Sequence, residues 1–245
     1  LHSYFQKKMI PFESVMSKVW NKKIFANIQK QVDKASIDLA EERGSCPDAA
    51  DYGIKERFSN KTAIAPTASI SIICGGTSPG IEPIAANSYT HKTLSGSFNV
   101  RNKYLQKILE KHGKNDEETW SSITTNQGSV SHLDYLTQEE KDVFKTAFEL
   151  DQRWIVDLGA DRTPHISQAQ SINIFIPADI HKRDLHQIHF QAWKKGLKSL
   201  YYCRSKSIQR AENVNDSKLT DVTANVYKSK QQTEQPEYEE CLSCQ

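Results

Sequence analysis

The sequence has no long hydrophobic segment. None of its apolar runs approaches the roughly 20 residues that a membrane-spanning helix needs. The opening LHSYFQKKMIPFES also lacks the apolar core of a secretory signal peptide. The sequence therefore predicts a cytoplasmic protein with no membrane partner, and its 245 residues suffice for one sizeable core or two small ones.

An excess of charge of one sign is also missing. The chain has 32 basic and 30 acidic residues, which gives a formal net charge of only +2. Nucleic-acid-binding surfaces need a basic excess, so this balance argues against a nucleic-acid partner. It favours a small molecule or another protein as the binding partner.

Cysteines are few and do not form a disulfide framework. Cys46, Cys74 and Cys203 stand alone, whereas Cys241 and Cys244 form a Cys-x-x-Cys motif. A zinc site needs about four ligands, and neither a second pair nor a histidine lies near this motif, so we expect no metal site. A thioredoxin-like motif should begin a helix inside a fold. The residues alone leave a redox shuttle and a chance pairing as alternatives.

Glycine-rich nucleotide motifs are absent, but one segment still suggests a phosphate site. The stretch KTAIAPTASISIICGGTSPGIEP at positions 61–83 has an apolar run, a proline and then small hydroxyl residues. Small side chains let a backbone approach a ligand, and free amides at the start of a helix favour an anion. The alternative is a buried strand and a tight turn with no ligand. The periodicity of residues 70–74 fits a strand and a helix equally well.

Several segments carry clear helix signals. Residues 17–43 should form a long amphipathic helix that ends at Gly44, with an apolar face made by Val19, Ile24, Ile28, Val32, Ala35 and Leu39. Further helices are expected over residues 101–112, over 138–149 behind a Thr137–Glu140 capping box, from Asp151 onward, and over 180–195. Residues 45–60 should be a loop, and residues 87–100 a loop or a short strand.

Two strands should flank the last of these helices. Residues 170–176 alternate as a strand, and residues 197–203 (LKSLYYC) are expected to form another. Strand, helix, strand at this spacing predicts a parallel crossover and an α/β fold. Adjacent strand residues point to opposite faces, so Tyr201 and Tyr202 would ordinarily place one ring inside and one at the surface. Residues 213–245 have few large apolar side chains and should form a mobile tail.

Four motifs together resemble the large subunit of class I ribonucleotide reductase. They are APTAS with a downstream GIEP, the QAQSIN strand, the W-x-x-GLK-x-x-YY-x-R pattern at 193–204 and the terminal Cys-x-x-Cys. The resemblance implies the C-terminal half of a ten-stranded α/β barrel over residues 1–204, followed by a flexible redox tail over 205–245. It also implies reduction of ribonucleoside diphosphates to deoxyribonucleoside diphosphates.

Site residues follow from the same resemblance. Residues Pro66, Thr67, Ala68, Ser69 and Ile70 would hold the diphosphate of the substrate, with Ile70 contributing its backbone amide because it lacks the hydroxyl common at this place. Tyr201 and Tyr202 match the stacked pair that passes a radical toward the active site. Cys241 and Cys244 match the dithiol that reduces the active-site disulfide again after turnover.

The family's radical cysteine, its redox-active cysteine pair and its acid/base residues have no match in this chain. We therefore expect a piece of a longer polypeptide or a separately made part, inactive alone. Its expected partners are the N-terminal part of the large subunit, a small subunit that carries the radical metallocofactor, and thioredoxin or glutaredoxin. The chain itself should bind no cofactor. Alternatives are an inert nucleotide-phosphate-binding or assembly protein of this fold, and a thiol carrier that uses only the tail.

Overall fold

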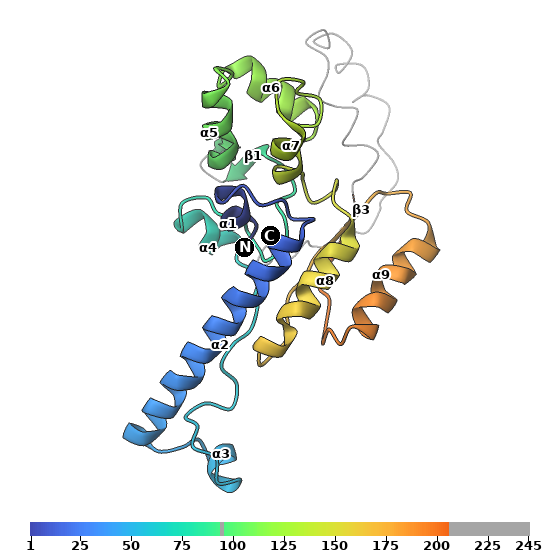
Figure 1. Ribbon diagram of the computed structural model, residues 1–245. Helices are drawn as coiled ribbons and strands as arrows, with labels where there is room; N and C mark the ends of the chain where they lie inside the picture. Colours follow the sequence, from blue (N-terminus) through green and yellow to red (C-terminus); the bar gives the residue numbers. More distant parts are fainter. Residues whose placement is uncertain (94–95, 206–245) are drawn as a thin grey trace, which may run out of the picture. The chain divides into compact units, whose positions relative to one another are not determined.

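The computed structural model describes residues 1–93 and 96–205 (Figure 1). Its elements in chain order are α1 (His2–Lys7), α2 (Val15–Arg43), α3 (Pro47–Asp51), α4 (Ala68–Ile73), β1 (Ser88–Thr93), β2 (Gly96–Arg101), α5 (Lys103–Lys111), α6 (Glu117–Thr125), α7 (Gln138–Val143), α8 (Gln152–Arg162), a 3-10 turn η1 (Thr163–His165), β3 (Ile174–Ile176), α9 (Lys182–Lys194) and β4 (Cys203–Ser205). Within these ranges no helix is long and apolar enough to cross a membrane.

Helix α2 confirms the long helix but corrects its buried face. The Ser14 hydroxyl accepts a hydrogen bond from the Ser17 amide at the start, and Gly44 ends the helix with a φ of 82°. The buried positions are Ser17, Asn21, Phe25, Ser36 and Ala40, whereas Val19, Ile28 and Ala35 of the expected apolar face are exposed.

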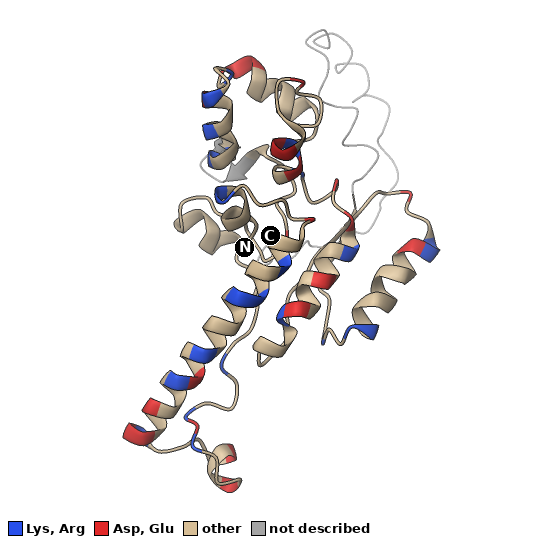
Figure 2. Ribbon diagram, viewed as in Figure 1, with Lys and Arg blue, Asp and Glu red and all other residues tan. Residues whose placement is uncertain are grey.

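Polar contacts with α8 explain why that face is buried. Helix α2 packs against α8, and the Asn21 side-chain amide donates to the Leu158 carbonyl at 2.8 Å. Lys18 pairs with Asp157 at 2.8 Å, and acidic and basic residues are interspersed along both helices (Figure 2). Small and polar side chains thus allow a close helix contact that an apolar periodicity does not reveal.

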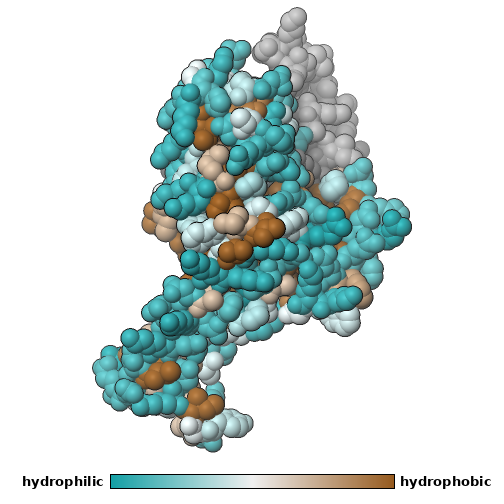
Figure 3. Space-filling view, in the orientation of Figure 1, coloured by the Kyte–Doolittle hydropathy of each residue, from teal (hydrophilic) through white to brown (hydrophobic). Residues whose placement is uncertain are grey.

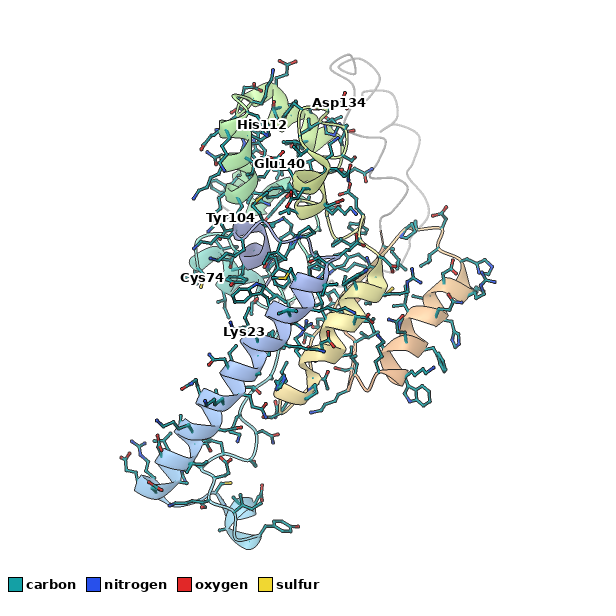
Figure 4. All side chains as sticks on the ribbon, in the orientation of Figure 1. Lys23, Cys74, Tyr104, His112, Asp134 and Glu140 are labelled. Atoms are coloured by element: carbon teal, nitrogen blue, oxygen red, sulfur yellow. The ribbon has the colours of Figure 1, made fainter. Side chains whose placement is uncertain are left out.

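One hydrophobic core lies around α5, α6 and α7. Leu105, Leu109, Trp120 and Ile123 are almost fully buried in it. The capping box at Thr137 and Glu140 is present, but α7 ends at Val143, six residues before the expected end. The Glu140 carboxylate also lies 3.1 Å from His112 Nε2 and so joins α7 to the end of α5 (Figure 4).

The segments before and after α5 differ from the expectations in detail. The segment expected over residues 87–100 to be a loop or a short strand contains β1 and most of β2, which pair antiparallel with Ser88 opposite Arg101. Helix α5 begins after Asn102, whose side-chain oxygen accepts the Tyr104 amide. Helix α6 was not expected, and the loop predicted over 45–60 contains α3.

A second core surrounds three parallel segments. Ile64 forms a parallel bridge with Gln170, and farther along β3 pairs in parallel with β4. Helix α9 connects β3 to β4, which confirms the predicted parallel crossover. Helix α8 contacts both β3 and α9 and covers β3, whose three residues are each less than 10% exposed. Both strands are shorter than expected, and β4 begins only after the two tyrosines.

Candidate functional site

The hydroxyl-rich segment forms the beginning of a helix. The Ser71 amide donates to the Thr67 carbonyl at 2.8 Å, which closes the first turn of α4. The Thr67 amide and hydroxyl both donate to the Pro79 carbonyl, at 3.1 and 3.0 Å, and hold the entry to the turn. Helix geometry leaves the amides of Ala68, Ser69 and Ile70 without acceptors inside the helix. The segment can therefore offer three N–H groups to an oxyanion.

The outer side of α4 is apolar. Ile70, Ile72 and Ile73 are 58%, 59% and 86% exposed, and they contribute the apolar surface over α4 at the left of Figure 3. Ser71 alone of the helix is buried, and its hydroxyl donates to the Ala68 carbonyl. The ambiguity between strand and helix periodicity is thus resolved in favour of a helix.

A cleft lies beside this segment. It has a volume of about 280 Å³ and is lined by residues 63–66, 168–171 and 199–201. These three stretches belong to the three parallel segments of the fold, so the cleft opens where neighbouring strands begin or end. Pro66 and Tyr201 both line it, whereas Thr67 to Ile70 lie outside its lining. The residue that precedes the hydroxyl-rich segment and the first tyrosine of the pair therefore lie at one cavity.

The two tyrosine rings lie against one another. Their centroids are 4.1 Å apart with an angle of 52° between the rings, and the residues are 40% and 44% exposed. The guanidinium of Arg204 lies 5.8 Å from the centre of the Tyr202 ring. The expectation that one ring would be packed inside and the other at the surface is wrong.

An irregularity in strand pairing accounts for this arrangement. The Tyr201 amide donates to the Ile172 carbonyl at 2.8 Å, while the Ile174 amide donates to the Tyr202 carbonyl at 2.9 Å. In a regular parallel ladder one residue would make both bonds. Here two residues, Tyr201 and Tyr202, oppose the single residue Asn173, which is a β-bulge. The extra residue interrupts the alternation that would send neighbouring side chains to opposite faces.

Two residues to which the sequence analysis assigned no role adjoin the bulge. Asn173 Oδ1 accepts the Tyr202 amide at 3.2 Å, and Asn173 Nδ2 donates to Glu82 Oε1 at 2.5 Å. Burial raises the pKa of Glu82, and the hydrogen bond from Asn173 and the positive charges of Arg204 and Arg162 counteract part of that effect. Both residues belong to motifs of the resemblance, Glu82 to GIEP and Asn173 to QAQSIN, and that membership was the available signal.

The isolated cysteines do not form a site. Cys46, Cys74 and Cys203 are free thiols, and Cys74 is exposed just after α4 (Figure 4). Burial raises the pKa of the Cys203 thiol, which disfavours the reactive thiolate. In the described part of the chain no three acidic, histidine or cysteine residues gather as metal ligands would. Cys241 and Cys244 lie outside the described residues.

Comparison with known proteins shows the family to which the chain belongs. Residues 48–203 match the family described as the ribonucleotide reductase barrel domain. The chain therefore belongs to this family, and its α/β fold is part of that barrel.

Similar proteins include large subunits of the reductase. The chain is 46% identical to the ribonucleoside-diphosphate reductase large subunit of Invertebrate iridescent virus 6 over 89% of its own length and 23% of that protein. It is 38% identical to the putative large subunit of Frog virus 3 over 99% of its length and 40% of the relative.

A solved structure shows the same likeness. The class Id ribonucleotide reductase alpha subunit of Actinobacillus ureae superposes with a TM-score of 0.78 at 40% identity, over 84% of this chain and 37% of the other. The chain thus spans well under half the length of these relatives.

Proposed function

We propose that this chain forms part of the large subunit of a ribonucleoside-diphosphate reductase. Its contribution is the substrate-phosphate segment, a tyrosine radical relay and the tail dithiol. The remaining catalytic groups come from the rest of the large subunit, and the radical comes from a small subunit that holds the metallocofactor. The relatives named above are themselves described as ribonucleoside-diphosphate reductase large subunits, which supports this reaction.

The substrate segment is proposed to bind the diphosphate with backbone amides. The open N–H groups of Ala68, Ser69 and Ile70 suit the terminal oxygens of a diphosphate, and the nearby hydroxyls of Thr67 and Ser69 can add further bonds. The adjoining cleft, reached past Pro66, has room for part of a nucleoside. The predicted departure at Ile70 fits this scheme, because its amide and not its apolar side chain would meet the ligand.

The contact between the two tyrosine rings is the observation that carries the proposal. A radical reaches a tyrosine when the phenol gives one electron and its hydroxyl proton to the group that held the radical before. It moves on when the tyrosyl radical takes an electron and a proton from the next group. Rings with centroids 4.1 Å apart can pass the electron without an intervening residue. Tyr201 also lines the cleft, so the relay would end beside the proposed substrate position.

The tail is proposed to serve the redox cycle. Ribose reduction oxidises two thiols to a disulfide, and a second dithiol must reduce that disulfide before the next turnover. Cys241 and Cys244 would exchange with it and would then be reduced by thioredoxin or glutaredoxin.

Substitution of the tyrosines tests the proposal. Tyr201→Phe and Tyr202→Phe each keep the ring but remove the phenolic hydrogen. In the complex assembled with the rest of a large subunit and a radical-bearing small subunit, each variant should bind nucleoside diphosphate normally and form no deoxyribonucleotide. Tyr52→Phe, at an 82% exposed position, is the matched control and should keep full turnover. Normal turnover in both relay variants would remove the radical relay from the proposal.

A further inference from the structure

The bulge leaves one backbone group outside the strand pairing. Because Tyr201 takes the Ile172 carbonyl, the Tyr202 amide has no carbonyl partner in the ladder. The side chain of Asn173, the single residue opposite the bulge, supplies the acceptor for this amide at 3.2 Å. The N–H of Tyr202 is therefore held by a side chain, whereas its carbonyl stays paired with the Ile174 amide. The position of the Asn173 side chain thus affects the direction of the Tyr202 ring.

Glu82 determines which way the Asn173 amide faces. An amide side chain can turn over, and only one orientation presents its oxygen to the Tyr202 N–H. The Glu82 carboxylate accepts the Nδ2 hydrogen at 2.5 Å and so favours that orientation. An ionised carboxylate accepts and cannot donate. In the reverse orientation the Asn173 oxygen would face the Glu82 carboxylate, and the Asn173 NH2 would face the Tyr202 N–H, so neither hydrogen bond could form.

Glu82 is itself confined. It is only 7% exposed, and an added Cβ at Gly80 would lie 2.8–2.9 Å from its carboxylate atoms. A glycine at position 80 thus leaves the space that the carboxylate occupies. The second carboxylate oxygen, Oε2, is buried without a hydrogen-bond partner among the described residues. A carboxylate kept in such a place at the cost of an unsatisfied oxygen calls for a role.

We infer that Glu82 is a positioning residue for the tyrosine pair, acting through Asn173 to hold the bulge that brings the Tyr201 and Tyr202 rings together. This inference rests on the proposed function for the meaning of the ring contact, but not for its existence. Glu82 lies 91 positions before Asn173 in the chain, so the GIEP segment would fix the geometry of a segment that is distant in sequence but adjacent in the fold.

The ring contact can be measured without any turnover. In the full chain labelled with ¹³C on its tyrosine rings, the nuclear Overhauser cross-peak between Tyr201 and Tyr202 is assigned from the spectra of the two phenylalanine variants. Glu82→Ala and Asn173→Ala should each weaken this cross-peak at least fivefold. Glu82→Gln should retain it, because the glutamine carbonyl oxygen can still accept the Asn173 N–H.

Gln152→Ala is the matched control. Gln152 is also 7% exposed and its side-chain oxygen accepts the Phe175 amide at 2.8 Å, so it supports the same strand but not the bulge. This variant should keep the cross-peak. If Glu82→Ala fails to fold, Gly80→Ala decides, because its methyl group displaces the carboxylate and should weaken the cross-peak in the same way. An unchanged cross-peak in the folded Glu82 or Gly80 variant, or an equal loss in Gln152→Ala, would overturn the inference.

Turnover of the assembled enzyme separates this inference from the proposed relay. Glu82→Ala should lower deoxyribonucleotide formation at least tenfold and Glu82→Gln should restore most of it. Loss of the cross-peak with unchanged turnover would support the positioning role and refute the relay. An unchanged cross-peak would refute the positioning role whatever the turnover.

Discussion

Replacing Arg162 should destabilise the fold around the site. Arg162 is 1% exposed, and its Nε donates to Gln170 Oε1 at 2.6 Å. Gln170 lies at the bridge to Ile64 and lines the cleft, so the bond ties α8 to the segment that forms the cleft wall. Burial lowers the pKa of Arg162 to about 9, so the guanidinium is still charged at neutral pH.

The size of the effect follows from these contacts. A hydrogen bond from a charged donor contributes about 1.5–3 kcal/mol, and the two buried methylenes that truncation to alanine removes contribute about 1.6 kcal/mol. Removal of a desolvated charge offsets part of this sum. We expect Arg162→Ala to cost about 2–4 kcal/mol, and Arg162→Met, which keeps the apolar stem, about 1–3 kcal/mol.

Urea unfolding of the full chain measures this cost. With a slope of about 2 kcal/mol per M, a loss of 3 kcal/mol lowers the midpoint by about 1.5 M. Arg153→Ala is the control, because Arg153 is on the same helix with its side chain 68% exposed and should shift the midpoint little. A midpoint for Arg162→Ala equal to that of Arg153→Ala would refute the reasoning.

Three further predictions concern the proposed substrate segment at residues 67–70, the tail and the effect of pH. Ser69→Glu should weaken nucleoside diphosphate binding to the assembled complex, measured by calorimetry, by at least tenfold through steric exclusion and charge repulsion. Ser121→Glu, the same change at an exposed site on α6, should leave that affinity unchanged. Equal affinities of the Ser69→Glu and parent complexes would leave the segment with a structural role only. The double variant Cys241→Ser, Cys244→Ser should stop multiple turnover with the protein reductant yet spare a single turnover of the pre-reduced complex, and full steady-state activity would contradict the shuttle. Burial holds the pKa of His2 at about 3, below its ordinary 6.5, so its contribution is complete above pH 6.5 and is lost as the pH falls. Between pH 6.5 and 5 the free energy of unfolding should drop by about 2 kcal/mol more in the parent chain than in His2→Gln, and identical pH profiles would exclude this role.

Local signals predicted the helices well where a cap or stop marks an end. The Thr137–Glu140 box, Asp151 before α8 and Gly44 after α2 all act within one turn of the chain, so a sequence displays them directly. The buried face of α2 was not predictable in the same way, because polar Asn21 is buried by a bond to Leu158, far along the sequence.

The candidate site was predicted by motif and not by geometry. The resemblance indicated Tyr201 and Tyr202 as a stacked pair, whereas strand alternation alone placed them on opposite faces. The bulge that decides between the two depends on hydrogen bonds between the two tyrosines and residues 172–174, which no local pattern reveals. Glu82 joins the site for the same reason, through a contact made only in the folded chain.

Deoxyribonucleotide formation by the reconstituted complex tests the central claim most directly. The chain is incubated with a ribonucleoside diphosphate and a dithiol, first alone and then with the complementary part of a large subunit and a radical-bearing small subunit. We expect no product from the chain alone, product from the full mixture, and none when the Tyr202→Phe chain replaces the parent. Product formation by the chain alone, or the same yield with and without it in the full mixture, would contradict the account.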